Sequence, residues 1–165
     1  MKKIIFVLSI VSLLLCIGVM IYRGIIFNQQ CEGYLKRAAD ANSIELAEVE
    51  LRKAIHYCEE KGLTSGYTSI FYRTPDEDLG FWFTNLQTSL KELEDLPTNS
   101  TSLEKSNMLL KLRETLTDQT GDGTSVTVPK GISRFPYNVG FTIWGWVSFF
   151  IAIVSAIFIL REDFY

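Results

Sequence analysis

Few side chains in this 165-residue chain could support acid–base or metal chemistry, because it has a single histidine, His56. On a helix, His56 lies with the charged residues Arg52, Lys53, Glu59 and Glu60 and away from the apolar positions. One histidine cannot supply a zinc constellation, a di-iron motif or a histidine-based triad. We therefore interpret His56 as a solvent-exposed surface residue and predict no metal and no cofactor.

The three cysteines all fall at apolar positions. Cys16 lies in the first apolar run, where we expect it to be a small packing residue. Cys31 and Cys58 lie on the facing sides of two predicted helices, so an oxidising compartment could join them. With a turn centred near Asn42, however, they are offset by about five residues, or about 7.5 Å, which exceeds the reach of a disulfide across a helix pair. We predict free thiols, with a Cys31–Cys58 disulfide as the alternative.

Two acidic segments resemble functional sites but are better explained otherwise. Residues 118–123 resemble the start of a calcium loop, yet the third position is Thr120 and the twelfth is Pro129, where a bidentate Glu is needed. Asp76, Glu77 and Asp78 suit the positive end of a helix that starts beside them. The sequence therefore predicts a protein that is not an enzyme.

Two long apolar runs flank the segment that holds most of these polar side chains. Residues 4–22 and 139–160 are 19 and 22 residues long, and neither contains a charge. A helix of the shorter length reaches about 28 Å, which matches a bilayer core of about 30 Å. No Ala-x-Ala-like cleavage site follows the first run before Arg23, so we expect an uncleaved signal anchor rather than a signal peptide.

Two spans place both termini on one side of a membrane, and Lys2 and Lys3 favour the cytoplasm for that side. We expect a multi-pass protein of a bacterial inner (plasma) membrane with an extracytoplasmic centre. The predicted order is a cytoplasmic tail (1–3), a span (4–22), a helical domain (24–117), a linker (118–138), a second span (139–160) and a cytoplasmic tail (161–165).

The stretch between the spans is acidic and helical in pattern. Residues 24–134 hold 12 Lys and Arg against 17 Asp and Glu, which argues against nucleic acid as a partner. Asn42 and Ser43 cap one helix, which stops at Gly62, and Thr74 and Thr101 each start another. The sequence therefore predicts an all-α fold: two transmembrane helices flanking an antiparallel bundle of about four helices, with an irregular or β-like linker that has a brief strand at 126–128.

Small residues recur at helical spacing in both apolar runs, and such stripes let helices approach closely in lipid. We expect the two spans to pack on each other, with contact to other chains as the alternative. The stripes consist of Ser9, Ser12 and Cys16 in the first run and Gly145, Ser148, Ala152 and Ser155 in the second.

Phe81 lies opposite the apolar seam of its predicted helix. One interpretation is that the loop carrying Tyr67, Phe71 and Tyr72 folds back and covers the ring. The other is that Phe81, with Tyr67 or Tyr72, anchors a partner or a membrane surface. The two differ in whether the ring is buried.

These patterns favour a non-enzymatic membrane protein whose extracytoplasmic domain mediates protein–protein interaction, as an accessory or assembly subunit. The expected partners are the lipid bilayer and other membrane or extracytoplasmic proteins, or a second copy of the chain. The alternative is a ligand-sensing ectodomain that works through a separate transducer.

Overall fold

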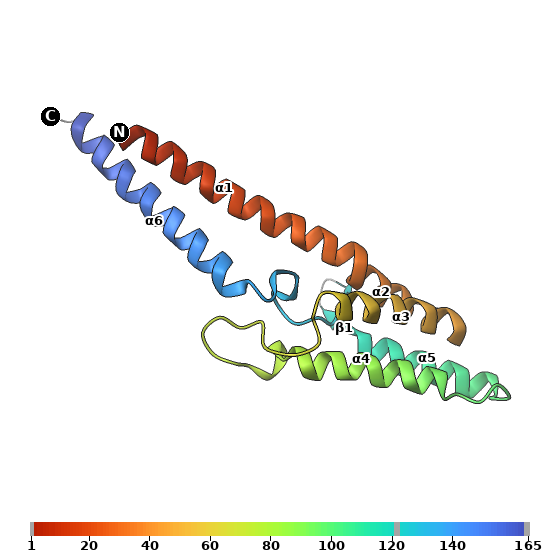
Figure 1. The fold of residues 1–165 in the computed structure, drawn as a ribbon. Coiled ribbons are helices and arrows are strands. Elements are labelled where there is room, and N and C mark those ends of the chain that lie inside the picture. Colours follow the sequence, from red (N-terminus) through yellow and green to blue (C-terminus); the bar gives the residue numbers. More distant parts are fainter. Residues whose placement is uncertain (1, 121–122, 164–165) are drawn as a thin grey trace. The chain divides into compact units, whose positions relative to one another are not determined.

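The computed structural model describes residues 2–120 and 123–163. The chain is mostly helical, as predicted, with a small two-stranded sheet (Figure 1). It divides into two compact units. Unit 1 comprises Met1–Ile25 and Ser133–Tyr165, and unit 2 comprises Ile26–Ile132.

Unit 1 is built on the two apolar helices α1 (Lys2–Phe27) and α6 (Asn138–Asp163). Both are long and apolar enough to cross a membrane, judged by length and composition. Their contacts run antiparallel. The Lys2 ammonium lies 5.6 Å from the centre of the Phe158 ring at one end, and Arg23 bonds to the carbonyl of Ser133 at the other. The N-terminus of α1 and the C-terminus of α6 therefore lie at the same end of unit 1.

The first helix continues beyond the apolar run. A π-helical turn, η1 (Asn28–Glu32), joins α1 to α2 (Gly33–Ala39). A β-carbon on Gly33 would lie 3.0 Å from the carbonyl oxygen of Asn28, which is crowded. Glycine at this position therefore suits the widened turn, which holds Cys31 toward the core of unit 2.

Helix α3 (Ile44–Glu60) begins and ends at the predicted residues. The Ser43 hydroxyl accepts a hydrogen bond from the amide of Leu46 at 3.2 Å, which is an N-cap. At the other end Gly62 adopts φ +66°, and the amides of Gly62 and Leu63 bond to the carbonyls of Glu59 and Cys58. This is a Schellman ending, and only glycine enters its left-handed position without strain.

Helix α4 (Leu79–Glu94) begins later than predicted. Thr74 and Pro75 start only a short 3₁₀ turn, η2 (Pro75–Glu77). The carboxylate of Asp78 then caps α4 by accepting the amides of Gly80 and Phe81 at 2.8 and 3.1 Å. The prediction was wrong because Asp78 competes with Thr74 as a cap, and backbone geometry rather than residue type decides between them.

Helix α5 (Ser102–Leu116) starts after Thr101, as predicted, with a capping box between Thr101 and Glu104. The segment after it is not a plain linker. It forms an antiparallel hairpin of β1 (Thr117–Thr120) and β2 (Gly123–Val126), in which Thr117 pairs with Val126. The expected strand at 126–128 is therefore displaced toward the N-terminus, and its partner strand was not predicted. A further 3₁₀ turn, η3 (Ile132–Arg134), precedes α6.

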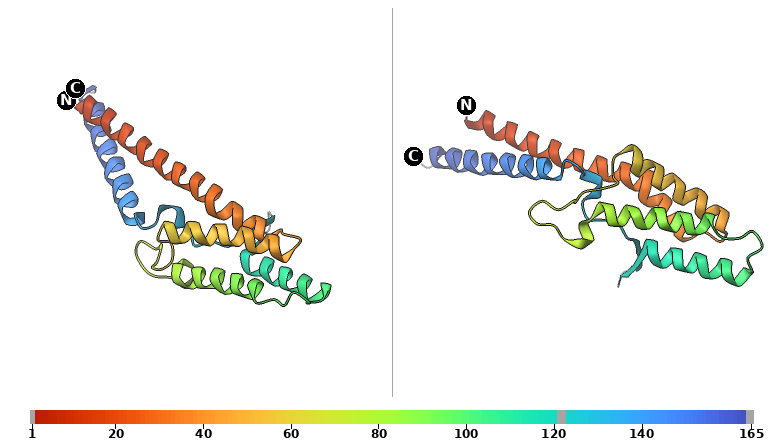
Figure 2. Two further views of the ribbon diagram at one scale, coloured as in Figure 1. Left: turned by 45° about the vertical axis from the view of Figure 1, so that its right-hand side comes forward. Right: turned by 60° about the horizontal axis from the view of Figure 1, so that its bottom comes forward.

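Four helices form the core of unit 2, and they run alongside one another in Figures 1 and 2. Helix α2 packs on α3 and α5, and α3 packs on α4. The hairpin is tied to them because the Trp82 indole donates to the carbonyl of Thr127 at 2.9 Å. The apolar side chains with no exposed surface are Cys31, Leu35, Ala47, Leu51, Ala54, Cys58 and Leu79.

Candidate interaction surface

The segment between α3 and α4, residues 63–78, forms a loop closed at its base, which we call the aromatic loop. The amide of Leu79 bonds to the carbonyl of Gly66 at 2.9 Å, and that of Thr68 bonds to Glu77 at 3.1 Å. Tyr67 and Asp78 form an isolated antiparallel bridge. These bonds hold the base against the start of α4, while the tip extends beyond the ends of α3 and α4 (Figure 1).

The tip of the aromatic loop exposes large apolar side chains. Phe71 is 88% and Tyr72 77% exposed, and Tyr67 and Ile70 are each 36% exposed. The Arg73 guanidinium stacks 5.0 Å from the centre of the Tyr67 ring. Aromatic rings and arginine are the side chains enriched at the centres of protein interfaces.

Phe81 lies on α4 beside the base of this loop, and its side chain is 67% exposed. The prediction that it points away from the seam is confirmed, whereas the interpretation that the loop folds back and covers it is wrong. The loop bonds to the backbone at the start of α4 instead. Phe71, which that interpretation assigned to the covering loop, is the most exposed of these aromatic rings.

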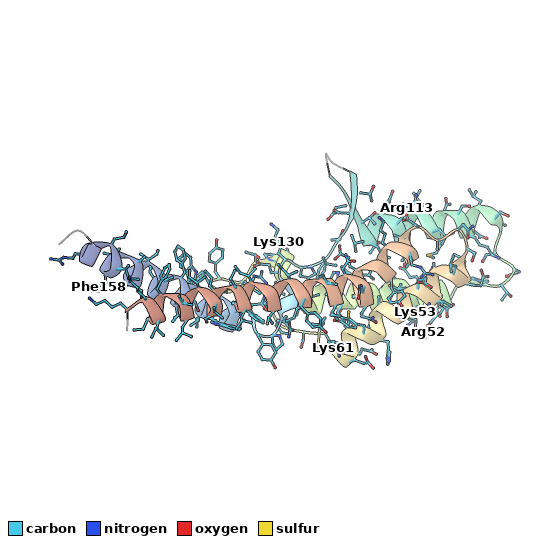
Figure 3. The ribbon with its side chains drawn as sticks, turned by 90° about the horizontal axis from the view of Figure 1, so that it is seen from above. Arg52, Lys53, Lys61, Arg113, Lys130 and Phe158 are labelled. Carbon is cyan, nitrogen blue, oxygen red and sulfur yellow. The ribbon has the colours of Figure 1, made fainter. Side chains whose placement is uncertain are left out.

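Two clefts in unit 2 are lined by paired charges. One, of about 510 Å³, lies between α2, α5 and the hairpin and includes Lys36, Asp40 and Arg113. Arg113 donates to the carbonyl of Ala39 at 3.1 Å and lies 3.4 Å from Asp40. The other, of about 580 Å³, lies between α3 and α4, where Arg52, labelled in Figure 3, bridges Glu48 and Glu94 at 2.6 Å each.

His56 lines the second cleft, with its side chain 71% exposed and its Nε2 atom 3.3 Å from Glu60. Its predicted surface position is confirmed. Within residues 2–120 and 123–163, no group of three or more His, Cys, Asp or Glu side chains could hold a metal ion. Asp118 of the calcium-like segment lies in β1, and residues 121 and 122 lie outside the described residues.

Glu50 is the one carboxylate among the buried residues of the described chain, with 2% of its surface exposed. Arg37 lies 3.0 Å from one of its oxygens and Lys53 lies 2.8 Å from the other. Lys53 also sits 5.3 Å from the centre of the Tyr34 ring, and Figure 3 shows it on α3. Both oxygens of Glu50 are therefore engaged by cations, an arrangement that ties α2 to α3 rather than one that supplies a free base.

The structure brings Cys31 and Cys58 together, with their sulfur atoms 3.5 Å apart. The predicted axial offset between them is wrong. The contacts Arg37–Glu50 and Tyr34–Lys53 are symmetric about the bond between Ser43 and Ile44, not about Asn42. The centre of the turn thus lies later in the chain than predicted, which lengthens the helical segment before it. The two cysteines therefore lie at nearly the same height along the helix pair.

The two helices of unit 1 touch along small residues. The hydroxyls of Ser12 and Ser148 lie 2.9 Å apart, and the Trp144 indole donates to Ser12 at 2.9 Å. The Cys16 thiol contacts the carbonyl of Phe141 at 3.7 Å. Other stripe positions are buried, namely Ser9, Ala152 and Ser155. Gly145 does not mark a close approach, because a β-carbon there would meet no atom within 4 Å.

Arg23 was not among the predicted site residues, although it joins α1 to the segment that leads into α6. It donates to the carbonyls of Ser133 and Phe135 at 2.9 Å each. Its guanidinium also lies 5.5 and 5.9 Å from the ring centres of Tyr137 and Phe141. The sequence signal that could have found it was a single arginine directly after the uncharged run 4–22. Aromatic residues cluster at the start of the run 139–160, the end that an antiparallel helix pair brings beside Arg23.

Comparison of the chain with protein-family models, curated proteins and solved structures finds no match.

Proposed function

We propose that this chain is a non-enzymatic, two-span integral membrane protein that acts as an accessory or assembly subunit. In this proposal α1 and α6 cross the membrane, and unit 2 is an antiparallel four-helix bundle on the extracytoplasmic side. The aromatic loop and Phe81 then dock onto an extracytoplasmic part of another membrane protein.

The membrane part of the proposal is supported by the surface of unit 1. Most large side chains exposed on α1 and α6 are apolar, including Leu8, Leu14, Val147 and Ile157. Such a surface is stable in lipid and unfavourable in water. The antiparallel contacts support termini that share one side, and Lys2 and Lys3 favour the cytoplasm of a bacterium for that side.

The orientation is tested with reporter fusions after residues 120 and 165. A reporter that works only outside the cytoplasm should be active at 120 and inactive at 165. The reverse pattern would overturn the orientation without affecting the fold.

The interaction part of the proposal rests on one observation, the exposure of Phe71, Tyr72 and Phe81. Scattered apolar residues are normal on any surface. Three aromatic rings that are each at least two-thirds exposed, on one loop and the adjoining helix turn, are unusual. Burying such rings against a partner contributes strongly to binding, since rigid aromatic side chains lose little entropy. The Arg73–Tyr67 stack adds a polar rim.

The docking proposal is tested by photo-crosslinking in native membranes. Benzoyl-phenylalanine at residue 71 should give an adduct of defined mass with one protein. The same group at residue 103, where Leu103 is 70% exposed on α5, is the matched control and should give none. Adducts with lipid alone at residue 71, or equal adducts at both positions, would contradict the proposal. In the Phe81→Ala background the specific adduct should weaken, with the melting temperature nearly unchanged.

A ligand-sensing role through a separate transducer is the second candidate, and the cleft beside Arg113 favours it. This space of about 510 Å³ is lined by two cations, Lys36 and Arg113, and by two carboxylates, Asp40 and Glu114. Small molecules that carry both charges, such as amino acids, are the appropriate probes. A concentration-dependent rise in melting temperature that is lost in Lys36→Ala would favour this role over docking.

A further inference from the structure

Cys31 and Cys58 form the one pair of reactive side chains in the described residues that lie in contact inside the core. Their sulfurs are 3.5 Å apart, and neither residue is exposed to solvent. Both thiols are free in this structure. A disulfide bond is about 2.05 Å long, so the sulfurs must approach by about 1.5 Å to be joined.

The backbone around Cys31 aligns it with Cys58. Phe27, Cys31 and Leu35 are all buried although each is four residues from the next. In a regular α-helix such a series drifts by about 40° per step, because four residues exceed the 3.6 of one turn. The π-helical turn η1 corrects this drift, and Gly33 accommodates it by leaving space for the Asn28 carbonyl.

We propose that Cys31 and Cys58 are joined by a disulfide in the cell, a modification that rests on the proposed extracytoplasmic location of unit 2. The oxidant is the disulfide of a thiol–disulfide oxidoreductase. One cysteine thiolate attacks it to give a mixed disulfide, and the second thiolate displaces the oxidoreductase. The protein gains one S–S bond, the oxidoreductase loses one, and the two protons of the cysteine thiols pass to its two sulfurs.

Because both thiols are buried in the folded chain, the exchange takes place as the hairpin of α2 and α3 folds. The bond then closes the hairpin at the end where the chain enters unit 2, since the rings of Phe27 and Tyr57 meet edge-on there, with their centres 6.2 Å apart. Cys58 also anchors the aromatic loop, because its carbonyl accepts the amide of Leu63 at 2.8 Å. Oxidation therefore fixes the helix end from which the aromatic loop leaves.

The test uses the full-length chain with Cys16→Ala, which leaves only the two cysteines of the pair. Cells are quenched in acid, the protein is denatured, and free thiols are labelled with a maleimide polymer. No label should attach until a reductant is added, after which two should attach. Cys31→Ala and Cys58→Ala each should take one label without reductant. A band at twice the mass would indicate a bond between chains and overturn the proposal.

Purified protein in detergent separates the disulfide from the membrane orientation. Chain that is first reduced and denatured, then refolded with oxidised glutathione, should have both thiols protected from labelling and melt roughly 10 °C higher than chain refolded without it. The double variant Cys31→Ala, Cys58→Ala, which cannot form the bond, should show no such rise. If purified chain refolded with oxidised glutathione keeps two free thiols, the geometry is refuted. Reduced thiols in cells whose residue-120 reporter is extracytoplasmic would refute the modification. Reduced thiols with a cytoplasmic reporter would refute both the modification and the proposed location.

Discussion

In unit 1 the exposed side chains are large and apolar, and small or polar residues lie between the helices. Ser9, Cys16, Ser148 and Ser155 are buried there, while Leu14 is 62% exposed. In unit 2 the order is reversed, because leucines fill the core and the ion pairs of Arg52 and other charged residues lie on the surface. Helices in lipid gain nothing from hiding leucine and associate through close packing, whereas helices in water associate by burying it. The contrast favours a different solvent for each unit.

The aromatic loop departs from the pattern of its own unit. Phe71 and Tyr72 are as bare as the side chains on α1, although the loop belongs to the unit with a polar surface. Isolated exposed residues such as Leu103 need no explanation, but a local group of rings does. We therefore interpret the loop as the place where unit 2 meets another surface.

The largest expected effect is a loss of stability on truncating a core leucine in unit 2. Leu51 on α3 has no exposed surface. Leu51→Ala should lower the free energy of unfolding by about 2–5 kcal/mol, from lost burial and the cavity that remains. The measurement is denaturant unfolding of the full-length chain in mild detergent.

Leu14→Ala is the matched control for this comparison, since Leu14 lies on α1 and is 62% exposed. In detergent or lipid the replaced side chain leaves one apolar environment for another. The expected change is below about 0.5 kcal/mol. Equal losses for the two variants would mean that the two units share one solvent, and the comparison would fail.

A smaller effect is expected at Arg23, the charged residue that ties α1 to the chain before α6. Arg23→Ala removes both carbonyl hydrogen bonds and both ring contacts, which should weaken the association of the helices by about 1.5 kcal/mol, or roughly tenfold. The readout is copper-catalysed cross-linking of Ser12→Cys with Ser148→Cys in a Cys16→Ala background.

Arg23→Lys keeps the charge but cannot donate from two nitrogens of a planar fork, so its cross-linking should be intermediate. Cross-linking of Arg23→Ala at the wild-type rate would show that the small-residue contacts alone align the helices.

The sequence predicted elements whose signals are local. Ser43, Gly62 and the Thr101–Glu104 box each act within one helical turn, and each ends or starts a helix as expected. The strand β1 was missed, although a Gly-Asp pair, Gly121 and Asp122 in the sequence, is a two-residue hairpin signal. That signal was outweighed by the glycines and proline of the segment, which suggested a linker.

The features that the sequence did not predict depend on contacts between segments. The position of Cys31 along the helix axis relative to Cys58 depends on the conformation of residues 40–43 and on the π-helical turn η1. Neither feature leaves a clear mark on the spacing of the apolar residues. The exposure of Phe71 depends on whether residues 67–73 fold back, which no periodicity records. Phe81 was different, because the direction of a helical side chain follows from its position on the helix.

The smallest expected effect concerns pH and belongs to the water-exposed side of unit 2. The Thr101 amide and hydroxyl donate to the Glu104 carboxylate at 2.7 and 2.9 Å, and these bonds hold the pKa of Glu104 below its usual value. A lowered pKa in the folded state means that the unfolded chain binds a proton first, so the ionised carboxylate stabilises the fold at neutral pH. This contribution should disappear as the pH falls below about 4.3 toward the lowered pKa. Glu104→Gln keeps the capping hydrogen bonds but cannot titrate, so its unfolding free energy should fall less steeply with acid than that of the wild type. Parallel acid dependence of the two chains would show that the capping box acts by geometry alone.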